Sequence, residues 1–189
     1  MSRATYLHTL WDSLAGTWLL DRDLQSANAS EPSGRCVGTA TFKTRAPSPV
    51  LDQDGKLHLA DAEMLYRENG EFQLPNHVKV PFSKKYVWRL SVAGDDPEMS
   101  VWFTKPGTDQ VDYLFHNVDL TVAEGGRVAH GSGGHLCVED FYSTSYIFFM
   151  QESTPLDEMK AAALGSWETI HEVQGPSKDQ TLTTRFTRE

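Results

Sequence analysis

The densest group of reactive side chains lies in residues 133–142, which read Gly-Gly-His-Leu-Cys-Val-Glu-Asp-Phe-Tyr. The stretch brings together an imidazole, a thiol, carboxylates and a phenol. Residues two apart share one face of an extended strand, so His135 pairs with Cys137 and Asp140 pairs with Tyr142. The two pairs differ in parity, and a bulge or bend between them would re-aim their side chains. The alternative is a barrel strand whose polar groups merely satisfy one another.

Acid–base chemistry is the reaction class that these residue types favour. Histidine changes charge close to neutral pH, so His116 and His135 are candidates for a general acid and a general base. Asp140 could fix a histidine tautomer or act as the base, and Tyr142 could donate a proton to a developing oxyanion. Each has a structural alternative, such as a core-edge position for His116 or a strand-anchoring phenol for Tyr142. We predict His116, His135, Asp140 and Tyr142 as the catalytic group.

A metal site is the rival hypothesis for the same residues. His116, His135, Cys137 and Asp140 offer nitrogen, sulfur and oxygen ligands that suit zinc or another transition ion. The sequence contains no compact Cys-x-x-Cys or His-Glu-x-x-His pattern, so we predict neither a metal nor another cofactor. Cys137 is less favoured as a nucleophile, because a reactive thiol needs activation and exposure, and a cysteine within a strand is commonly buried.

Composition limits the classes of partner. The chain has 189 residues, with 26 acidic against 17 basic side chains, which argues against nucleic acid or an anionic membrane surface. No apolar segment is long enough to span a bilayer. Two cysteines, Cys36 and Cys137, do not make a disulfide framework. We expect a single domain over residues 1–189 in the cytoplasm, and leave a homodimer open.

The hydrophobic pattern predicts mainly strands. Leu7, Leu10, Trp11 and Leu14 follow helical spacing, with Ser2 able to cap the helix. Thr154-Pro155 opens a second predicted helix over 155–164, and Asn69-Gly70 predicts a hairpin turn. Many short strands joined by turns favour an all-β, antiparallel sandwich or barrel. The predicted strands cover residues 16–20, 36–43, 62–68, 71–74, 84–92, 99–104, 111–122, 127–131, 135–138, 141–151, 166–173 and 180–188.

The two ends of the chain narrow the fold. A short helix, then Gly16-x-Trp18 in the first strand, then an arginine in the last strand, resembles the calycin pattern of lipocalins and their relatives. In that pattern the tryptophan closes the barrel base and the arginine, here Arg185 or Arg188, stacks over its indole. The resemblance implies an antiparallel calycin-like β-barrel.

A second resemblance covers most of the chain and concerns the order of its motifs. The sequence is similar to the calycin-like family numbered 6314 among the domains of unknown function, whose name carries no activity. The most specific matching pieces are His135-x-Cys137-x-x-Asp140-x-Tyr142 and Gly175-Pro176-x-Lys178-Asp179. The others are Gly16-Thr17-Trp18 with Arg22, Gly38 with Phe42, Tyr66-Arg67-Glu68-Asn69-Gly70, Tyr86-Val87-Trp88, Phe115-His116, Trp167, Val173-Gln174 and Phe186-Thr187-Arg188.

A barrel of this size can hold one small ligand. Strand parity predicts a mostly aromatic lining with a few polar groups, which is how small-molecule sites are usually built. Two functions remain open: a cofactor-free enzyme that isomerises, cyclises or dehydrates a largely apolar, natural-product-like molecule, and a non-catalytic carrier. Calycin-like proteins that cyclise natural products favour the enzyme by analogy. The predicted ligand-binding residues are Tyr66, Glu68, Tyr86, Trp88, Phe103, Cys137 and Tyr146.

Lys178 and Asp179 follow a Gly-Pro turn near the end of the chain. We favour a solvated Lys–Asp pair there, because exposed ion pairs of this kind are common and weak. In the alternative interpretation, Lys178 reaches over the barrel mouth toward an anionic group.

Overall fold

The computed structural model describes residues 2–188 apart from 53, 94–95, 152–162 and 177. Within these residues, ten antiparallel strands close into a barrel in the order β1-β12-β11-β10-β9-β8-β7-β6-β5-β2, and β3 pairs with β4 outside it. The predicted antiparallel calycin-like barrel is confirmed. The elements are α1 (Arg3–Leu14), β1 (Gly16–Ser26), β2 (Gly34–Arg45), β3 (Val50–Leu51), β4 (Leu57–His58), β5 (Ala62–Gln73), β6 (Lys79–Ala93), β7 (Asp96–Thr104), β8 (Val111–Val122), β9 (Val128–Cys137), β10 (Asp140–Gln151), β11 (Ala163–Gln174) and β12 (Asp179–Thr187).

Alternating side chains explain why these segments form a barrel wall. In β1 the buried residues are Trp18, Leu20 and Arg22, two apart, while their neighbours Leu19 and Asp21 are exposed. This period of two places one set of side chains inside and the other in solvent. The parity of β1 therefore puts a charged residue, Arg22, in the barrel interior.

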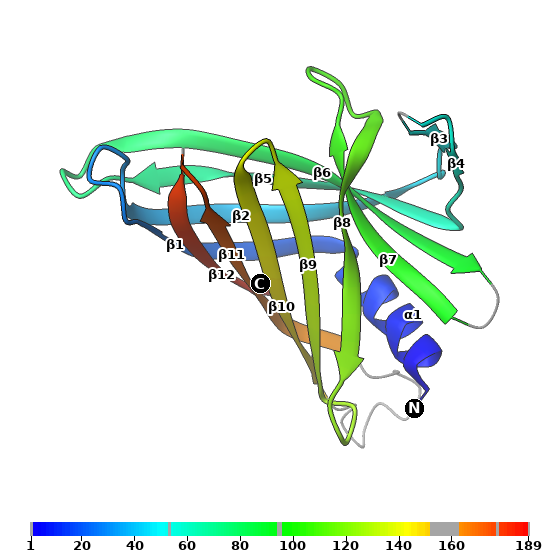
Figure 1. Cartoon of the computed structure of the whole chain (residues 1–189). Helices are drawn as coiled ribbons and strands as arrows, with labels where there is room; N and C mark the ends of the chain where they lie inside the picture. Colours follow the sequence, from blue (N-terminus) through cyan, green and yellow to red (C-terminus); the bar gives the residue numbers. More distant parts are fainter. Residues whose placement is uncertain (1, 53, 94–95, 152–162, 177, 189) are drawn as a thin grey trace.

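Helix α1 packs at one end of the barrel (Figure 1). The Ser2 hydroxyl accepts a hydrogen bond from the Thr5 amide, as a helix N-cap does. Five residues of its apolar face, Tyr6, Leu7, Leu10, Trp11 and Leu14, are buried against the barrel core. The helix thus closes this end of the barrel, and we call this end the base.

The predicted tryptophan–arginine contact lies at this base. The Trp18 indole N–H donates to the Leu14 carbonyl over 2.9 Å, and the Arg188 guanidinium lies 3.8 Å from the centroid of the Trp18 ring. Arg188 also donates to the carbonyls of Ser13 and Ala15 at the end of α1. The exposed Arg185 instead pairs with Glu168. Arg188 is therefore the calycin arginine.

Aromatic side chains fill the barrel next to the base. Trp167 and Phe186 stack with ring centroids 3.7 Å apart, and Trp167 meets Trp18 edge-on at 6.3 Å. This arrangement leaves little free volume in the half of the barrel that adjoins α1. We call the whole set the aromatic layer: Trp18, Phe42, Tyr66, Trp88, Tyr146, Phe148, Trp167 and Phe186.

The short β3–β4 hairpin lies outside the barrel beside β6 to β8 (Figure 1). Val50 of β3 belongs to a second apolar cluster with Leu65, Val87, Trp102 and Val111. These barrel residues face outward, so the hairpin covers apolar surface that would otherwise meet water.

Two local predictions need correction. The hairpin turn predicted at Asn69-Gly70 is wrong, because β5 continues through both residues. Gly70 pairs directly with Gly38 of β2, and the two strands lie so close there that a Cβ on Gly70 would lie 2.2 Å from the Val37 carbonyl oxygen. Gly70 is thus needed for close strand packing rather than for a turn. Most of the helix predicted over 155–164 lies outside the described residues, but Leu164 belongs to β11.

Candidate functional site

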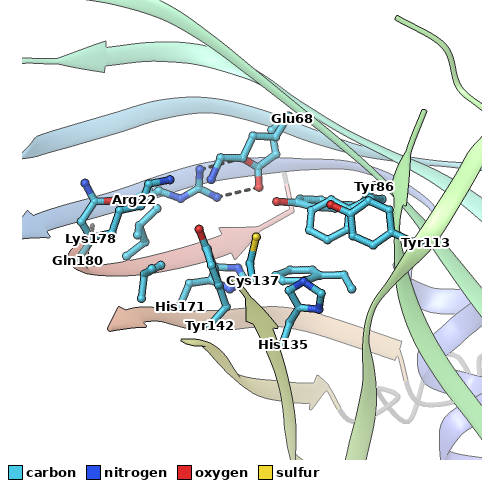
Figure 2. A pocket seen from close by; sticks show the side chains of 15 residues that line it. Arg22, Glu68, Tyr86, Tyr113, His135, Cys137, Tyr142, His171, Lys178 and Gln180 are labelled. Carbon is cyan, nitrogen blue, oxygen red and sulfur yellow. Dashed lines mark hydrogen bonds and ion pairs between the residues drawn. The ribbon is translucent and has the colours of Figure 1, made fainter. Parts of the chain in front are cut away.

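A cavity of about 320 Å³ lies inside the barrel, beyond the aromatic layer as seen from α1 (Figure 2). Its side chains come from β1, β5 to β12 and the residue before β12. Cys137 and Lys178 are exposed at its edge, which marks the mouth. The lining residues are Arg22, Glu68, Lys84, Tyr86, Phe103, Tyr113, Phe115, His135, Cys137, Tyr142, His171, Val173, Lys178, Gln180 and Leu182.

The reactive stretch at residues 133–142 forms a hairpin at this mouth. Cys137 ends β9 and pairs directly with Asp140, the first residue of β10, and His135 pairs with Tyr142. Val138 takes a left-handed φ of 58° in the turn between them. The change of parity between His135–Cys137 and Asp140–Tyr142 is therefore made by a two-residue turn and not by a bulge. The resulting hairpin places His135, Cys137 and Tyr142 on one wall of the cavity.

An ion pair is built into the opposite wall. The Arg22 guanidinium donates two hydrogen bonds to the Glu68 carboxylate, at 2.8 and 2.7 Å, and a third to the Thr184 hydroxyl. The Tyr66 hydroxyl also donates to Glu68, over 2.6 Å. Burial alone would raise the pKa of Glu68, but the charge and hydrogen bonds of Arg22 outweigh burial and hold that pKa below its ordinary value. Glu68 is thus a fixed, ionised carboxylate.

Two further amines line the cavity near this pair. Lys84 lies on β6 directly across from Glu68, and Lys178 reaches the mouth from the turn before β12. Burial, with the positive charge of Arg22, lowers the pKa of Lys84. Lys178 lines the cavity, which agrees with the alternative interpretation that its side chain reaches over the barrel mouth and not with the favoured solvated Lys–Asp pair. The cavity therefore holds three basic side chains against the single carboxylate of Glu68 among its described lining residues.

Aromatic rings form the side of the cavity that adjoins β6 to β8. Tyr86 stacks on Phe115 with centroids 5.7 Å apart, and Phe103 lies 4.7 Å from Phe115 and 4.6 Å from Tyr113. Figure 2 shows the rings of Tyr86 and Tyr113 on one side of the space and Arg22, Lys178 and Gln180 on the other. The cavity has an aromatic end and a basic end.

The two histidines of the lining differ in their surroundings. The His135 ring lies 5.7 Å from Phe115 and 6.4 Å from Tyr142, near the mouth. His171 is deeper, and its Nδ1 shares a 2.7 Å hydrogen bond with the Thr144 hydroxyl. Burial, with the charges of Lys84 and Arg22, lowers the pKa of His171 to about 3, so this imidazole is neutral at physiological pH.

His116 lies outside the cavity lining, although it was predicted as a catalytic residue together with His135. Its Nε2 shares a 2.7 Å hydrogen bond with the Tyr146 hydroxyl, and its Nδ1 is buried without a hydrogen bond to the described residues. Burial lowers its pKa to about 4. An irregular β7–β8 register gives the cavity position to Phe115. Gly133 makes room for His116, because a Cβ there would lie 2.2 Å from the imidazole.

The remaining predicted residues divide between the cavity and its surroundings. Asp140 does not line the cavity, and its carboxylate lies against Gly175, where a Cβ would come within 2.0 Å of it. Tyr66, Trp88 and Tyr146 lie in the aromatic layer, around a void of about 20 Å³. The predicted residues that the structure brings together in the cavity are Glu68, Tyr86, Phe103, His135, Cys137 and Tyr142.

Sequence reasoning missed the basic end of the cavity, although parity could have found it. Arg22 lies four residues after Trp18, Lys84 two before Tyr86, and His171 four after Trp167. Each of these spacings is an even number of residues. In a strand, each polar side chain therefore points to the same, inward side as the aromatic residue beside which it is counted. Their roles depend on partners in other strands, such as Glu68 for Arg22 and Thr144 for His171, which no motif within a single strand indicates.

The candidate metal ligands do not form a cluster. Among the described residues, no group of three or more His, Cys, Asp and Glu side chains is arranged to hold a metal ion. His116 faces Tyr146 and Asp140 faces Gly175, which separates them from His135 and Cys137 in the lining.

A closed antiparallel barrel with a helix at its base and a Trp–Arg stack there defines the chain as a calycin-like protein. The model of the Family of unknown function (DUF6314) matches residues 14–188, and the chain belongs to this family. No curated protein sequence matches the chain. Among solved structures, the S-type phycobiliprotein lyase CPES from Guillardia theta is similar, with a TM-score of 0.38 and 10% sequence identity over 95% of this chain and 90% of that one. In the described part of the chain, no helix is both long and apolar enough to cross a bilayer.

Proposed function

We propose that the barrel binds a small aromatic molecule that carries an acidic group. The observation that carries this proposal is the division of the cavity into an aromatic end, with Tyr86, Phe103 and Phe115, and a basic end, with Arg22 and Lys178. Aromatic side chains supply apolar contact area, and a few polar groups fix the orientation of a ligand. A volume of about 320 Å³ can hold a ligand of two or three rings.

The charge of the basic end supports an anion rather than a neutral polar group. Glu68 is neutralised by Arg22, which leaves the amine of Lys178 without a carboxylate partner among the described residues of the cavity. A carboxylate, sulfonate or phosphate on the ligand would meet a net positive field, which acts more strongly in a cavity than in water. This refines the largely apolar ligand expected from the sequence.

Binding can be tested with a matched pair of fluorescent probes. 8-Anilinonaphthalene-1-sulfonate and N-phenyl-1-naphthylamine share an aromatic core, but only the first carries a sulfonate. A charge-assisted contact contributes about 1.5–3 kcal/mol, so the sulfonate should improve affinity about tenfold or more. Lys178→Gln should reduce that preference. Lys85→Gln should not, because Lys85 pairs with Asp109 outside the cavity. Equal affinity for both probes would overturn the acidic ligand.

Acid–base catalysis on the bound molecule is the second candidate function, and a specific observation favours it. His135 and Tyr142 pair across β9 and β10 and line the cavity together, and neither side chain forms a hydrogen bond with the described residues. His135 would act as the base and Tyr142 as the acid in an isomerisation, cyclisation or dehydration. We leave His116 and Asp140 out of this proposal because neither lines the cavity.

Catalysis is tested once a co-purified ligand has been identified by native mass spectrometry. With that molecule or its precursor as substrate, His135→Ala and Tyr142→Phe should each lower turnover about 10²–10⁴-fold while leaving the melting temperature nearly unchanged. Unchanged turnover in both variants, or binding with no conversion, would support the non-catalytic carrier instead.

A further inference from the structure

Lys84 differs from other lysines of the chain in where its amine lies. It comes from the middle of β6 and lines the cavity between Glu68, across the β5–β6 ladder, and the ring of Tyr86 two residues on. Its neighbour Lys85 has the opposite parity and forms an ion pair with Asp109 on the outside. Lys178 reaches the cavity too, but from the exposed mouth.

The amine of Lys84 is not held in place by hydrogen bonds or an ion pair. Nζ forms neither a hydrogen bond nor an ion pair with any described residue. Its nearest candidate, Glu68, is occupied by Arg22 and Tyr66. Burial, and then the charge of Arg22, lower the pKa of Lys84 and outweigh the Glu68 carboxylate, which acts in the opposite direction. A lowered pKa favours the neutral form of an amine, and that form has the lone pair that a nucleophile needs.

We propose that Lys84 forms a reversible imine with an aromatic aldehyde held in the cavity. This inference rests on the proposed function, because the aldehyde must first bind with its ring against Tyr86, Phe103 and Phe115. The barrel would then retain its ligand through a covalent bond as well as through contacts, and would select carbonyl compounds from among aromatic acids.

The reaction balances without an oxidant or a reductant. The lone pair of Nζ adds to the carbonyl carbon, the C=O π bond opens, and the oxygen takes a proton to give a carbinolamine. Loss of that hydroxyl as water, and of a proton from nitrogen, leaves a C=N bond. The Tyr86 hydroxyl lines the same space, and burial, with the Glu68 carboxylate, raises its pKa to about 12. It therefore keeps its proton at neutral pH and is a candidate donor to the departing hydroxyl.

Reductive trapping tests the proposal on the full chain. The probe is 4-carboxybenzaldehyde, which joins an aromatic ring, an aldehyde and an acidic group, used at one equivalent with sodium cyanoborohydride. We expect a single adduct that adds the mass of the aldehyde less one oxygen, mapped by peptide mass spectrometry to Lys84. Lys84→Arg should lose this adduct while keeping a long basic side chain at the site, and Lys85→Arg should retain it.

The outcomes separate this inference from the proposed function. An adduct on Lys178, adducts spread over surface lysines, or none at all would overturn the imine. If the sulfonate probe still binds those same samples and 4-carboxybenzaldehyde still displaces it, the proposed function stands without covalent capture. If neither compound binds, both proposals fall. Displacement by the aldehyde should persist in Lys84→Arg, which shows that the variant is folded and that only the covalent step is lost.

Discussion

The pair of Arg22 and Glu68 combines the strongest polar contacts of the barrel interior, since both side chains are at most 4% exposed and are joined by two hydrogen bonds. Removing one partner of such a pair leaves an uncompensated buried charge, which costs about 3–5 kcal/mol. We therefore expect Arg22→Met to lower the free energy of unfolding by that amount in urea denaturation. Adding Glu68→Gln should recover part of the loss.

A matched pair on the outer face of the same strand is the control. Arg35 and Asp21 form an ion pair whose side chains are 61% and 51% exposed, so Arg35→Met should lower the free energy of unfolding far less than Arg22→Met does. Equal effects of Arg22→Met and Arg35→Met would show that the interior pair is hydrated, against the enclosed cavity described above.

Two histidines with lowered pKa values predict how stability depends on pH. Their pKa values are about 4 for His116 and about 3 for His171, against about 6.5 in an unfolded chain. Below pH 6.5 the unfolded state binds more protons, so the free energy of unfolding should fall as pH is lowered, by roughly 2 kcal/mol per histidine at pH 5. Urea titrations at pH 7 and pH 5 measure this, and His116→Gln or His171→Gln should each flatten the dependence. An unchanged slope in both variants would contradict their neutral, buried state.

At the scale of elements, the close pairing of β2 and β5 depends on two glycines. A Cβ on Gly70 would meet the Val37 carbonyl oxygen at 2.2 Å and Gly38 Cα at 2.8 Å, both backbone atoms that cannot rotate away. Overpacking of this kind typically costs about 1–3 kcal/mol, so Gly70→Ala should lower the unfolding free energy by that amount. The adjacent, exposed Asn69→Ala should change it by less than about 0.5 kcal/mol. A neutral Gly70→Ala would mean that the strands are further apart.

The same glycine shows where prediction from the sequence works and where it stops. Alternating patterns and the Gly16-x-Trp18 motif are local, so they predicted the strands, the barrel and the base. Asn69-Gly70 has the local chemistry of a turn, but its role depends on Gly38, which is distant in sequence. Strand parity was enough to predict that His135 and Cys137 share one face. The hydrogen bond of His116 to Tyr146 instead depends on the irregular β7–β8 pairing, which no sequence pattern indicates.

At the scale of the whole molecule, the barrel divides into a stabilising base and a binding half. Trp18 is fully buried beneath α1, and truncating a buried indole costs about 3–5 kcal/mol. Thermal denaturation should therefore show a large loss for Trp18→Ala and a loss of about 0.5–2 kcal/mol for Arg188→Ala, which removes the cation–π contact and the contacts with the end of α1. Arg185→Ala, the other candidate arginine, should be nearly neutral. Equal effects of the two arginine variants would contradict the assignment of the base.

The most direct test of the central claim is a crystal structure of the protein with 8-anilinonaphthalene-1-sulfonate. The two ends of the cavity predict its orientation: the ring system between Tyr86, Phe103 and Phe115, and the sulfonate toward Arg22 and Lys178. A probe bound on the outside of the barrel, or one inverted so that its sulfonate points at the aromatic end, would contradict the claim that this cavity receives aromatic acids.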